Sequence, residues 1–395
     1  MTAYTFSELI TFARTTTATV VGSNGLIQSA AINAPRFDYD PVTLAPRGIL
    51  IEEQRTNLLL RSEEFDNAVW TKSSSTVTTN AVVAPDGAST GDQLIEDTAT
   101  LSHGVTVGFS WVSGTTYTVS VLVRAAGRNF FQIAFPGAQF SNAFANFDVS
   151  SGALGSSNAA TATLTNFGNG WYRCTATATA TSSAFTSLGL LIQTSGTASR
   201  FGSYTGDGTS GLYIWGAQLE TGAFATSYIP TVASQVTRTA DQASIVAPMF
   251  APWYNQTEGT FVVEFMTGGA VASATASSAN NGTGNNRIVS LLSAGGNVQF
   301  FVSDGGSAQA NISPLSPVLA ASNTIYRMAA TYRVNSFSAA VNGVLGPEDT
   351  SGTVPAVDQL NIGSDFSSLR LNGHIRRITY YPVRLLDTQL QALTA

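Results

Sequence analysis

Short runs of alternating apolar and polar residues, separated by turn residues, recur along almost the whole chain. The run from Tyr117 to Val123 places Tyr and Val at every second position, with Thr and Ser between most of them. This spacing predicts a strand with one dry face and one wet face. Helical spacing is nearly absent, apart from a short helix predicted after Pro382 with Asp387 as its N-cap. The pattern therefore predicts an all-β fold.

The predicted strands fall into two groups of roughly seven, which fit two tandem β-sandwiches. We expect residues 1–55 to form an extended N-terminal attachment segment, residues 56–235 a jelly roll, and residues 236–395 a second sandwich. The strands expected in the first sandwich are 117–123, 130–135, 144–149, 161–166, 171–177, 188–193 and 212–219. Those expected in the second are 260–266, 288–292, 298–302, 325–332, 337–341, 359–362 and 374–380.

The N-terminal segment is too short and too polar to bury a core by itself. Its Asn24-Gly25 turn lies between apolar pairs and predicts a hairpin. We expect the segment to pack on a neighbouring domain, another subunit or a larger particle. Residues 230–238 are predicted to be a short linker that allows some relative motion of the sandwiches. Residues 270–286, rich in Ala, Ser, Gly and Asn, are predicted to form a mobile loop.

The charge balance argues against one class of partner. The chain has 18 Lys and Arg residues against 24 Asp and Glu residues, and its net charge is −6. Binding of nucleic acid needs a basic face, so we expect no nucleic-acid partner. No apolar run approaches the roughly 18 residues of a membrane span, so we expect no membrane insertion. The N-terminus lacks a basic region followed by an apolar stretch, which predicts that there is no signal peptide.

The single cysteine, Cys174, excludes an intramolecular disulfide and most cysteine-based metal sites. It lies in a strand-like run, where a small buried thiol is expected. Lys72 is the one lysine, so nearly all positive charges belong to arginine, which tolerates interfaces better than lysine does. A low charge together with many Ala, Ser, Thr and Gly residues suits a protein that is partly covered by copies of itself.

Two stretches of the chain resemble a known family. A Gly-rich turn and strand from Gly206 to Glu220 is followed by Ala225–Pro230, and Arg36–Leu58 contains Arg-Phe-Asp-Tyr-Asp-Pro and Arg-Thr-Asn-Leu. Both stretches resemble bacteriophage virion proteins of the head spike or tail fibre type, which carry a carbohydrate-binding-module-like jelly roll. The ending Leu371–Pro382, followed by a short helix, resembles the last strand of concanavalin-A-like lectin domains.

The resemblance implies a virion structural protein that projects from the particle surface and touches host surface polysaccharide. It implies a homotrimer that is attached to capsid or tail proteins through the N-terminal segment. Binding that is weak at each site would be strengthened by the number of copies on one particle. A purely structural decoration protein of the capsid or tail, which binds no sugar, is the alternative.

The sequence does not favour an enzyme. His103 and His374 have no ligand or nucleophile pattern nearby, and we expect both to be structural. Residues 87–91 match the spacing of a hydrolase nucleophile elbow, but turn residues precede them and a strand-like run follows, so we expect a turn. A polysaccharide-degrading glycosidase is a remote alternative, because it would have to bring acids together by folding. Those acids are Glu258, Glu264, Asp304 and Asp365.

Carbohydrate recognition needs exposed aromatic side chains that stack on sugar rings, with polar side chains beside them. We expect aromatic residues among turn residues to be exposed, and Trp171 and Trp215, which lie in strand patterns, to be buried. The candidate glycan-binding residues are Trp70, Trp111, Tyr204 and Trp253. No cofactor is expected, although a structural Ca²⁺ is a weaker hypothesis. Its candidate ligands are Glu63, Glu64, Asp66 and Asp207.

Overall fold

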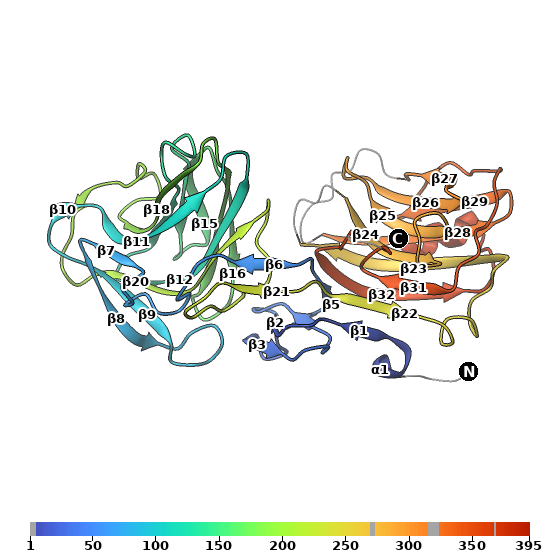
Figure 1. Ribbon diagram of the computed structural model, residues 1–395, viewed down its shortest axis with the longest axis horizontal. Coiled ribbons are helices and arrows are strands. Elements are labelled where there is room, and N and C mark those ends of the chain that lie inside the picture. Colours follow the sequence, from blue (N-terminus) through green and yellow to red (C-terminus); the bar gives the residue numbers. More distant parts are fainter. Residues whose placement is uncertain (1–4, 269–272, 315–323, 367–368) are drawn as a thin grey trace.

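The computed structural model describes residues 5–268, 273–314, 324–366 and 369–395. Two β-sandwiches lie side by side along the long axis of the molecule, with a narrow connection between them (Figure 1). Strands dominate the described residues, which contain two short helices, α1 (Phe6–Leu9) and α2 (Asp387–Thr394). These observations confirm the prediction of an all-β protein with two tandem sandwiches.

The first sandwich consists of two six-stranded sheets that enclose one hydrophobic core. Each strand predicted in this part overlaps an observed strand. Trp171 and Trp215 are buried as predicted, and so is the free thiol of Cys174. One sheet has the order β15 (Ala153–Asn158), β14 (Phe144–Asp148), β13 (Phe130–Ala134), β18 (Ala184–Gln193), β11 (His103–Trp111) and β7 (Thr71–Ser73). The other has the order β16 (Thr161–Asn166), β17 (Tyr172–Thr179), β12 (Thr116–Ala126), β20 (Gly211–Thr221), β9 (Gly91–Glu96) and β8 (Ser75–Val82).

The second sandwich has two seven-stranded sheets among the described residues, with a second large core between them. One sheet has the order β1 (Thr11–Ala13), β22 (Gln242–Ile245), β31 (Gln359–Ile362), β24 (Ala274–Asn280), β25 (Arg287–Leu292), β26 (Val298–Asp304) and β27 (Ser307–Ile312). The other has the order β30 (Val344–Leu345), β29 (Ser336–Val341), β28 (Ile325–Arg333), β23 (Glu258–Thr267), β32 (Gly373–Tyr381), β5 (Pro46–Ile51) and β4 (Phe37–Tyr39).

The N-terminal segment differs from the predicted extended arm. Its strands β1, β4 and β5 belong to the sheets of the second sandwich. The domain boundary predicted at residue 55 therefore places strands of the same sheets in different domains. Phe12 pairs with Ala243 and Ile49 with Ile375, and both Phe12 and Ile49 enter the second core. A segment that cannot bury a core alone thus gains one by adding edge strands to another part of the chain.

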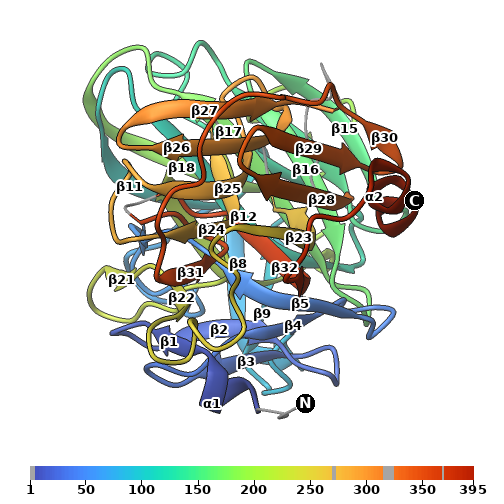
Figure 2. The ribbon, with the colours of Figure 1, turned by 90° about the vertical axis from the view of Figure 1, so that its right-hand side faces the viewer.

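The rest of the N-terminal segment forms a hairpin that packs toward the first sandwich. Strands β2 (Ala18–Val21) and β3 (Ile27–Ala30) pair around the predicted turn, where Gly25 adopts a φ of 78°. Ile27 packs in a small hydrophobic cluster with residues of the first sandwich, among them Trp215 and Tyr228. The view along the long axis shows β1 to β5 gathered on one side of the molecule (Figure 2).

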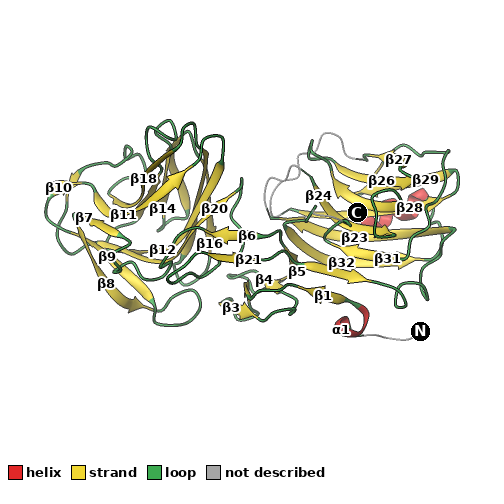
Figure 3. Cartoon of the chain, in the orientation of Figure 1, coloured by secondary structure: helices red, strands yellow, loops and turns green. Residues whose placement is uncertain are grey.

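The predicted linker is part of a two-stranded ribbon. Strand β21 (Val236–Arg238) pairs with β6 (Arg55–Asn57), and the two strands run side by side between the sandwiches (Figure 3). Two chain segments therefore connect the sandwiches at this point, where the sequence predicted one. A further two-stranded sheet, β10 (Thr100–Leu101) with β19 (Tyr204–Thr205), lies at the far end of the first sandwich.

Two other local predictions are wrong in part. Residues 274–280 of the predicted mobile loop form β24, whose small side chains are all buried; residues 270–272 of that loop lie outside the described part of the chain. Alanine and serine are not among the large apolar residues by which we predicted strands. Small side chains nevertheless fit a strand that is closely packed on both faces. The predicted C-terminal helix is present as α2, but its N-cap is Leu386, and Asp387 is its first helical residue. Neither helix in the described ranges has the length and apolar character needed to cross a membrane.

Candidate functional site

A cleft of about 980 Å³ lies where the two sandwiches and the N-terminal segment meet. Residues of β12, β16 and β17 line it from the first sandwich, and residues of β2, β4 and β5 line it from the N-terminal segment. The loop 223–228 after β20 also lines the cleft, as do Asn372 and His374 of the second sandwich. Three parts of the chain that are distant in sequence therefore contribute to one concave site.

The first sandwich presents a face covered with threonine to this cleft. Threonine occupies every second position of β16 and much of β17, while residues between them, such as Cys174, point into the core. The rows are in register, with Thr161 opposite Thr177 and Thr163 opposite Thr175. Each hydroxyl can donate one hydrogen bond and accept others. We call this surface the threonine face; its cleft-lining members are Thr116, Thr161, Thr163, Thr165, Thr175, Thr177 and Thr179.

Arg173 extends the threonine face with a positive charge. It lies on β17 directly opposite Thr165 of β16 and lines the cleft. Its Nη2 donates hydrogen bonds to Ser120 Oγ (2.8 Å) and to the carbonyl of Thr226 (2.7 Å). These two contacts fix Nη2 of the guanidinium between β12 and the loop 223–228.

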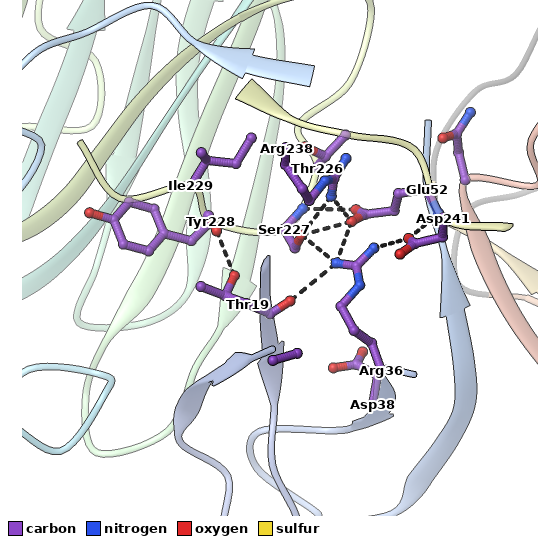
Figure 4. A network of polar contacts seen from close by, with 12 residues as sticks. Thr19, Arg36, Asp38, Glu52, Thr226, Ser227, Tyr228, Ile229, Arg238 and Asp241 are labelled. Carbon is purple, nitrogen blue, oxygen red and sulfur yellow. Dashed lines mark hydrogen bonds and ion pairs between the residues drawn. The ribbon is translucent and has the colours of Figure 1, made fainter. Parts of the chain in front are cut away.

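Beside the cleft, three arginines and two carboxylates form a buried network. Figure 4 shows two of the arginines with both carboxylates. Arg36 lies at its centre: Nη1 donates to Glu52 Oε2 (2.8 Å), and Nη2 contacts Asp241. Arg14 Nη1 donates to Asp241 Oδ1 (3.0 Å), and Arg238 contacts Glu52. None of the five residues is more than 6% exposed. They are called the junction below.

Ser227 ties the junction to the first sandwich. Its backbone N–H donates to Glu52 Oε1 (2.8 Å), and its hydroxyl donates to Glu52 Oε2 (2.7 Å). The same hydroxyl accepts hydrogen bonds from Arg36 (2.7 Å) and Arg238 (2.8 Å). The junction therefore links the N-terminal segment, the loop after β20 and the start of the second sandwich through charged hydrogen bonds, which are stronger than neutral ones.

The charges of the junction support one another. Burial alone would raise the pKa of Glu52, but Arg238 and Arg36 lower it more strongly, so the pKa lies well below its usual range. Burial likewise favours a lower pKa for Arg36, but Glu52 and Asp241 raise it above its usual value. Opposite charges at short range thus offset the loss of water around each group.

Two polar side chains near the junction, Glu220 and Asn57, make hydrogen bonds that involve no arginine. Glu220 accepts hydrogen bonds from Gln218 Nε2 (2.7 Å), from the backbone N–H of Thr226 (3.0 Å) and from its hydroxyl (2.5 Å). Asn57 Nδ2 donates to the carbonyl of Ile229 (2.9 Å). These contacts fix the loop 223–228 against β6 and β20, and this loop forms part of the cleft lining.

The two stretches that carry the family resemblance meet in this region. Arg36 and Glu52 come from Arg36–Leu58, and Ser227 comes from the stretch that ends at Pro230. Sequence reasoning singled out both stretches but missed that their polar residues face one another. The signal was present in Glu52, which directly follows the apolar run Ile49–Ile51, because a charge placed among buried strands requires a partner.

His374 links the second sandwich to the N-terminal segment. Its Nε2 lies 2.7 Å from Asp38 Oδ2, and Asp38 Oδ1 accepts a hydrogen bond from the backbone N–H of Val21. The other ring nitrogen, Nδ1, has no partner among the described residues. His103 is also buried, between the carbonyls of Ser74 (2.6 Å) and Tyr204 (3.1 Å). Both histidines thus make polar contacts within the fold, and His374 also lines the cleft.

The expectation that Trp70 and Trp111 are exposed is wrong. Their exposed fractions are 0% and 2%, and their indole N–H groups donate to the carbonyls of Arg61 and Thr186 (both 3.0 Å). Turn residues flank both tryptophans in sequence, but their side chains join the core of the first sandwich. A ring enclosed in this way has no face for a sugar.

Tyr204 and Trp253 are half-buried and lie in different sandwiches. The Tyr204 hydroxyl donates to Glu96 Oε2 (2.6 Å), and its ring lies against His103. Trp253 Nε1 donates to the carbonyl of Met249 (2.7 Å), and its ring packs against aromatic neighbours of the second sandwich. None of the four predicted aromatic residues lines the cleft, so the structure does not gather them into one site.

The predicted calcium ligands have other partners. Glu63 accepts a hydrogen bond from Tyr228 (2.8 Å), and Glu64 from Arg61 (2.8 Å). Asp207 accepts from the backbone and side chain of Thr209 and Ser210 at its own turn, and Asp66 lies near Lys72, which bonds its carbonyl. No three His, Cys, Asp or Glu side chains converge as a metal site within the described ranges.

Comparisons with known proteins give likenesses in structure alone. No family model and no curated protein matches the chain. The CBM40 domain of the Ruminococcus gnavus IT-sialidase, in a structure with α2,3 sialyllactose, shows 21% identity and a TM-score of 0.32 over 38% of this chain and 89% of that one. The NanB sialidase of Streptococcus pneumoniae shows 14% identity and a TM-score of 0.33 over 38% of this chain and 26% of its own. Domains LG4-5 of the mouse laminin α1 chain show 10% identity and a TM-score of 0.27 over 72% and 88%. Likenesses at these TM-scores carry no argument about the site.

Proposed function

We propose that this protein binds carbohydrate in the cleft between its two sandwiches. The observation that carries the proposal is the threonine face, which borders a space of about 980 Å³. Sugar hydroxyls both donate and accept hydrogen bonds, and threonine hydroxyls do the same. In a sheet, such hydroxyls repeat about every 4.8 Å across strands and about every 6.7 Å along them. A repeating polar surface suits a chain of repeating sugar units.

Aromatic rings of the cleft supply the apolar part of a sugar site. Phe167 and Phe224 are half-buried and line the cleft. Phe224 is held by the guanidinium of Arg55, which lies 4.8 Å from the ring centre. A ring of this kind can cover the apolar face of a pyranose. We propose that these two residues take the role that the sequence suggested for Trp70 and Trp111.

The size of the cleft favours a segment of polysaccharide over a single sugar. Pockets for drug-sized ligands occupy about 300–1,000 Å³, so this cleft lies at the upper end of that range. Ser120 and Thr226 bond Nη2 of Arg173 on β17, while the threonines of β16 are exposed. The ligand would therefore contact β16 and β17 along their length.

We further propose that the protein acts on the surface of a bacteriophage particle, as a head spike or tail fibre that touches host polysaccharide. The support is the sequence resemblance of Arg36–Leu58 and Gly206–Pro230. Homotrimer formation and attachment to capsid or tail proteins belong to the same proposal. Several copies on one particle would strengthen weak binding, because linked sites raise the effective concentration.

We propose a binding role without catalysis. The cleft carboxylates Asp38 and Glu52 are engaged by His374 and by the arginines of the junction. Glu264, an acid of the glycosidase alternative, contacts Arg376 at 2.8 Å. A glycosidase needs one free carboxylic acid and one free carboxylate across the bond that is cleaved. Release of reducing ends from a bound polysaccharide would contradict the proposal.

The proposal is tested by binding of the full chain to a panel of immobilised bacterial capsular and O-antigen polysaccharides in a biosensor. The variant Thr163→Trp places a bulky ring on the exposed part of the threonine face. We expect it to reduce binding at least tenfold by filling the space that the ligand needs. The matched control is Thr78→Trp on β8, an exposed threonine of the same sheet that does not line the cleft.

Two results would overturn the proposal. One is the absence of saturable binding to every polysaccharide of the panel at millimolar repeat units, with protein that unfolds cooperatively. The other is binding that both variants reduce equally, because a site elsewhere would then be involved. Loss of binding in Thr163→Trp alone supports the cleft.

An attachment role without sugar binding is the second candidate, and exposed apolar residues of the N-terminal segment favour it. Ile32, Val42 and Leu44 are each about half exposed. Deleting residues 1–55 would not test this role, because β1, β4 and β5 would be removed from the second sandwich. The double variant Ile32→Ser with Leu44→Ser is suitable, with Val112→Ser on the first sandwich as control. If attachment is the function, the double variant is lost from purified virions while the control is retained.

A further inference from the structure

Arg173 is the arginine of the cleft that lacks a carboxylate partner. Arg47, the other arginine in the cleft lining, pairs with Asp40 at 2.8 Å. No carboxylate oxygen of the described residues lies within 4.0 Å of the Arg173 guanidinium, although the structure contains many such pairs elsewhere. The arginines of the junction show the contrast, since Arg36 alone contacts two carboxylates.

The donors of Arg173 are only partly used. Nη2 bonds Ser120 and Thr226, whereas Nε and Nη1 have no hydrogen bond within the described part of the chain. Neither of these two nitrogens is among the side-chain atoms that are sealed from solvent without a partner. They therefore reach the solvent of the cleft. Their N–H groups point in different directions, so each offers a separate hydrogen bond.

The acids that act on Arg173 do not contact its guanidinium. Burial lowers the pKa of Arg173, and Glu220 and Glu52 raise it from a distance without restoring its usual value. Both carboxylates are occupied, Glu220 by Gln218 and Thr226, and Glu52 by the junction. Arg173 is thus a half-buried cation without a direct counterion, and an incoming anion could pair with its free donors.

The free donors of Arg173 suit a carboxylate oxygen. Because Ser120 and Thr226 occupy Nη2, a carboxylate would accept a single charged hydrogen bond from Nη1 or Nε. Thr165 lies directly opposite Arg173, and Thr163 and Thr175 are one step further along the strands. A carboxylate at Arg173 would thus have hydroxyl partners for the rest of the same sugar within one or two strand spacings.

We propose that the cleft selects glycans that carry carboxylate groups, with Arg173 as the residue that recognises the carboxylate. This inference rests on the proposed function, and it names the chemical class of the ligand. The ligand is an acidic polysaccharide whose carboxylate accepts a charged hydrogen bond from a free N–H of Arg173, while its hydroxyls contact the threonine face.

The test compares each acidic polymer with the same polymer after its carboxyl groups are reduced to alcohols. The probes are polygalacturonate, alginate and polysialic acid, and the readout is equilibrium binding of the full chain. The variants are Arg173→Gln and Arg173→Lys. Arg333→Gln is the charge-matched control, because Arg333 is exposed at the end of β28, away from the cleft. Thermal unfolding shows that each variant is folded.

We expect carboxyl reduction to weaken binding of at least one polymer about tenfold or more, the usual effect of a lost charged hydrogen bond. Arg173→Gln should weaken binding of the acidic form by a similar factor and leave binding of the reduced form unchanged. Arg173→Lys keeps the charge but loses the guanidinium that Ser120 and Thr226 position, and its binding should fall between that of wild type and Arg173→Gln. Arg333→Gln should bind like wild type.

Failure of this inference is distinguishable from failure of the proposed function. If the acidic and reduced polymers bind equally well, and Thr163→Trp abolishes the binding of both, the cleft binds sugar but does not recognise the carboxylate. If Arg173→Gln weakens both forms equally, Arg173 only positions the loop 223–228. If no polymer binds in either form and the bacterial polysaccharide panel fails as well, both proposals are overturned.

Discussion

The junction and the threonine face lie side by side but use their polar groups in opposite ways. In the junction, arginine and carboxylate side chains are buried and paired with one another. On the threonine face, the hydroxyls of β16 are exposed, and Arg173 keeps two donors open to solvent. Polar groups that are closed off in this way hold three parts of the chain together. Polar groups that are left open are available to a ligand.

The difference also concerns what a substitution removes. A buried charge that loses its partner stays away from water, which costs several kcal/mol. An exposed hydroxyl that is removed leaves its neighbours to water and costs little. Substitutions in the junction should therefore lower the free energy of unfolding more than substitutions on the threonine face. Substitutions on the threonine face should weaken ligand binding more than they lower stability.

The largest effect is expected for Glu52→Gln in the junction. The change leaves Arg36 and Arg238 buried without the carboxylate that both contact. We expect the free energy of unfolding to fall by about 3–5 kcal/mol, measured by urea unfolding at neutral pH. Glu348→Gln is the control, because Glu348 pairs with Arg384 at 2.9 Å but is 40% exposed on its side chain.

The control should lose less than about 1 kcal/mol, as is usual for an exposed ion pair. Equal losses in the two variants would show that the junction contributes no more than a surface pair. The proposed difference between the buried, paired charges of the junction and the exposed hydroxyls of the threonine face would then be contradicted.

A smaller effect is expected from acid, and its sign follows from the pKa of Glu52. This pKa is lowered in the folded protein because Arg238 and Arg36 outweigh burial. The stabilisation is therefore fully present above the usual pKa of glutamate, about 4.3, and is lost as the pH falls toward the folded value. Below pH 4.3 we expect the stability difference between wild type and Glu52→Gln to shrink by about 1.4 kcal/mol per pH unit.

Urea unfolding of wild type, Glu52→Gln and Glu348→Gln at pH 7, 5, 4 and 3 measures this change. The Glu348→Gln difference should stay small throughout the series. A wild-type to Glu52→Gln difference that is as large at pH 3 as at pH 7 would contradict the assignment, because ionised Glu52 could not then be its source.

The strands of the core could be predicted from sequence because burial imposes a period of two. The runs 161–166 and 359–362 match β16 and β31 residue for residue. Strand β24 escaped prediction, because Ala, Ser and Thr carry no apolar alternation and are buried at every position. The added strands β1, β4 and β5 also escaped prediction, since pairing between residues as distant as 49 and 375 leaves no trace in local sequence.

The candidate site was harder to predict than the fold. Turn residues around Trp70 and Trp111 suggested exposure, but a sandwich end closes over large rings and buries them. The threonine face was visible as Thr-Ala-Thr in β16 and β17, yet it was considered only as a strand pattern. Which face of a sheet borders a cleft depends on where other parts of the chain pack. In this protein the junction holds those parts together, through contacts between residues that are distant in sequence.

The smallest stability effect is expected on the threonine face, with Thr165→Ala. Thr165 is exposed on β16 and lies opposite Arg173, so its loss should change the free energy of unfolding by no more than about 0.5 kcal/mol. If the face binds sugar, the same change removes one hydrogen bond to the ligand and should weaken binding about 2- to 10-fold. Parallel urea unfolding and biosensor titration of this variant measure both quantities. A loss of several kcal/mol in stability would instead make Thr165 part of the closed polar structure, and the contrast with the junction would no longer hold.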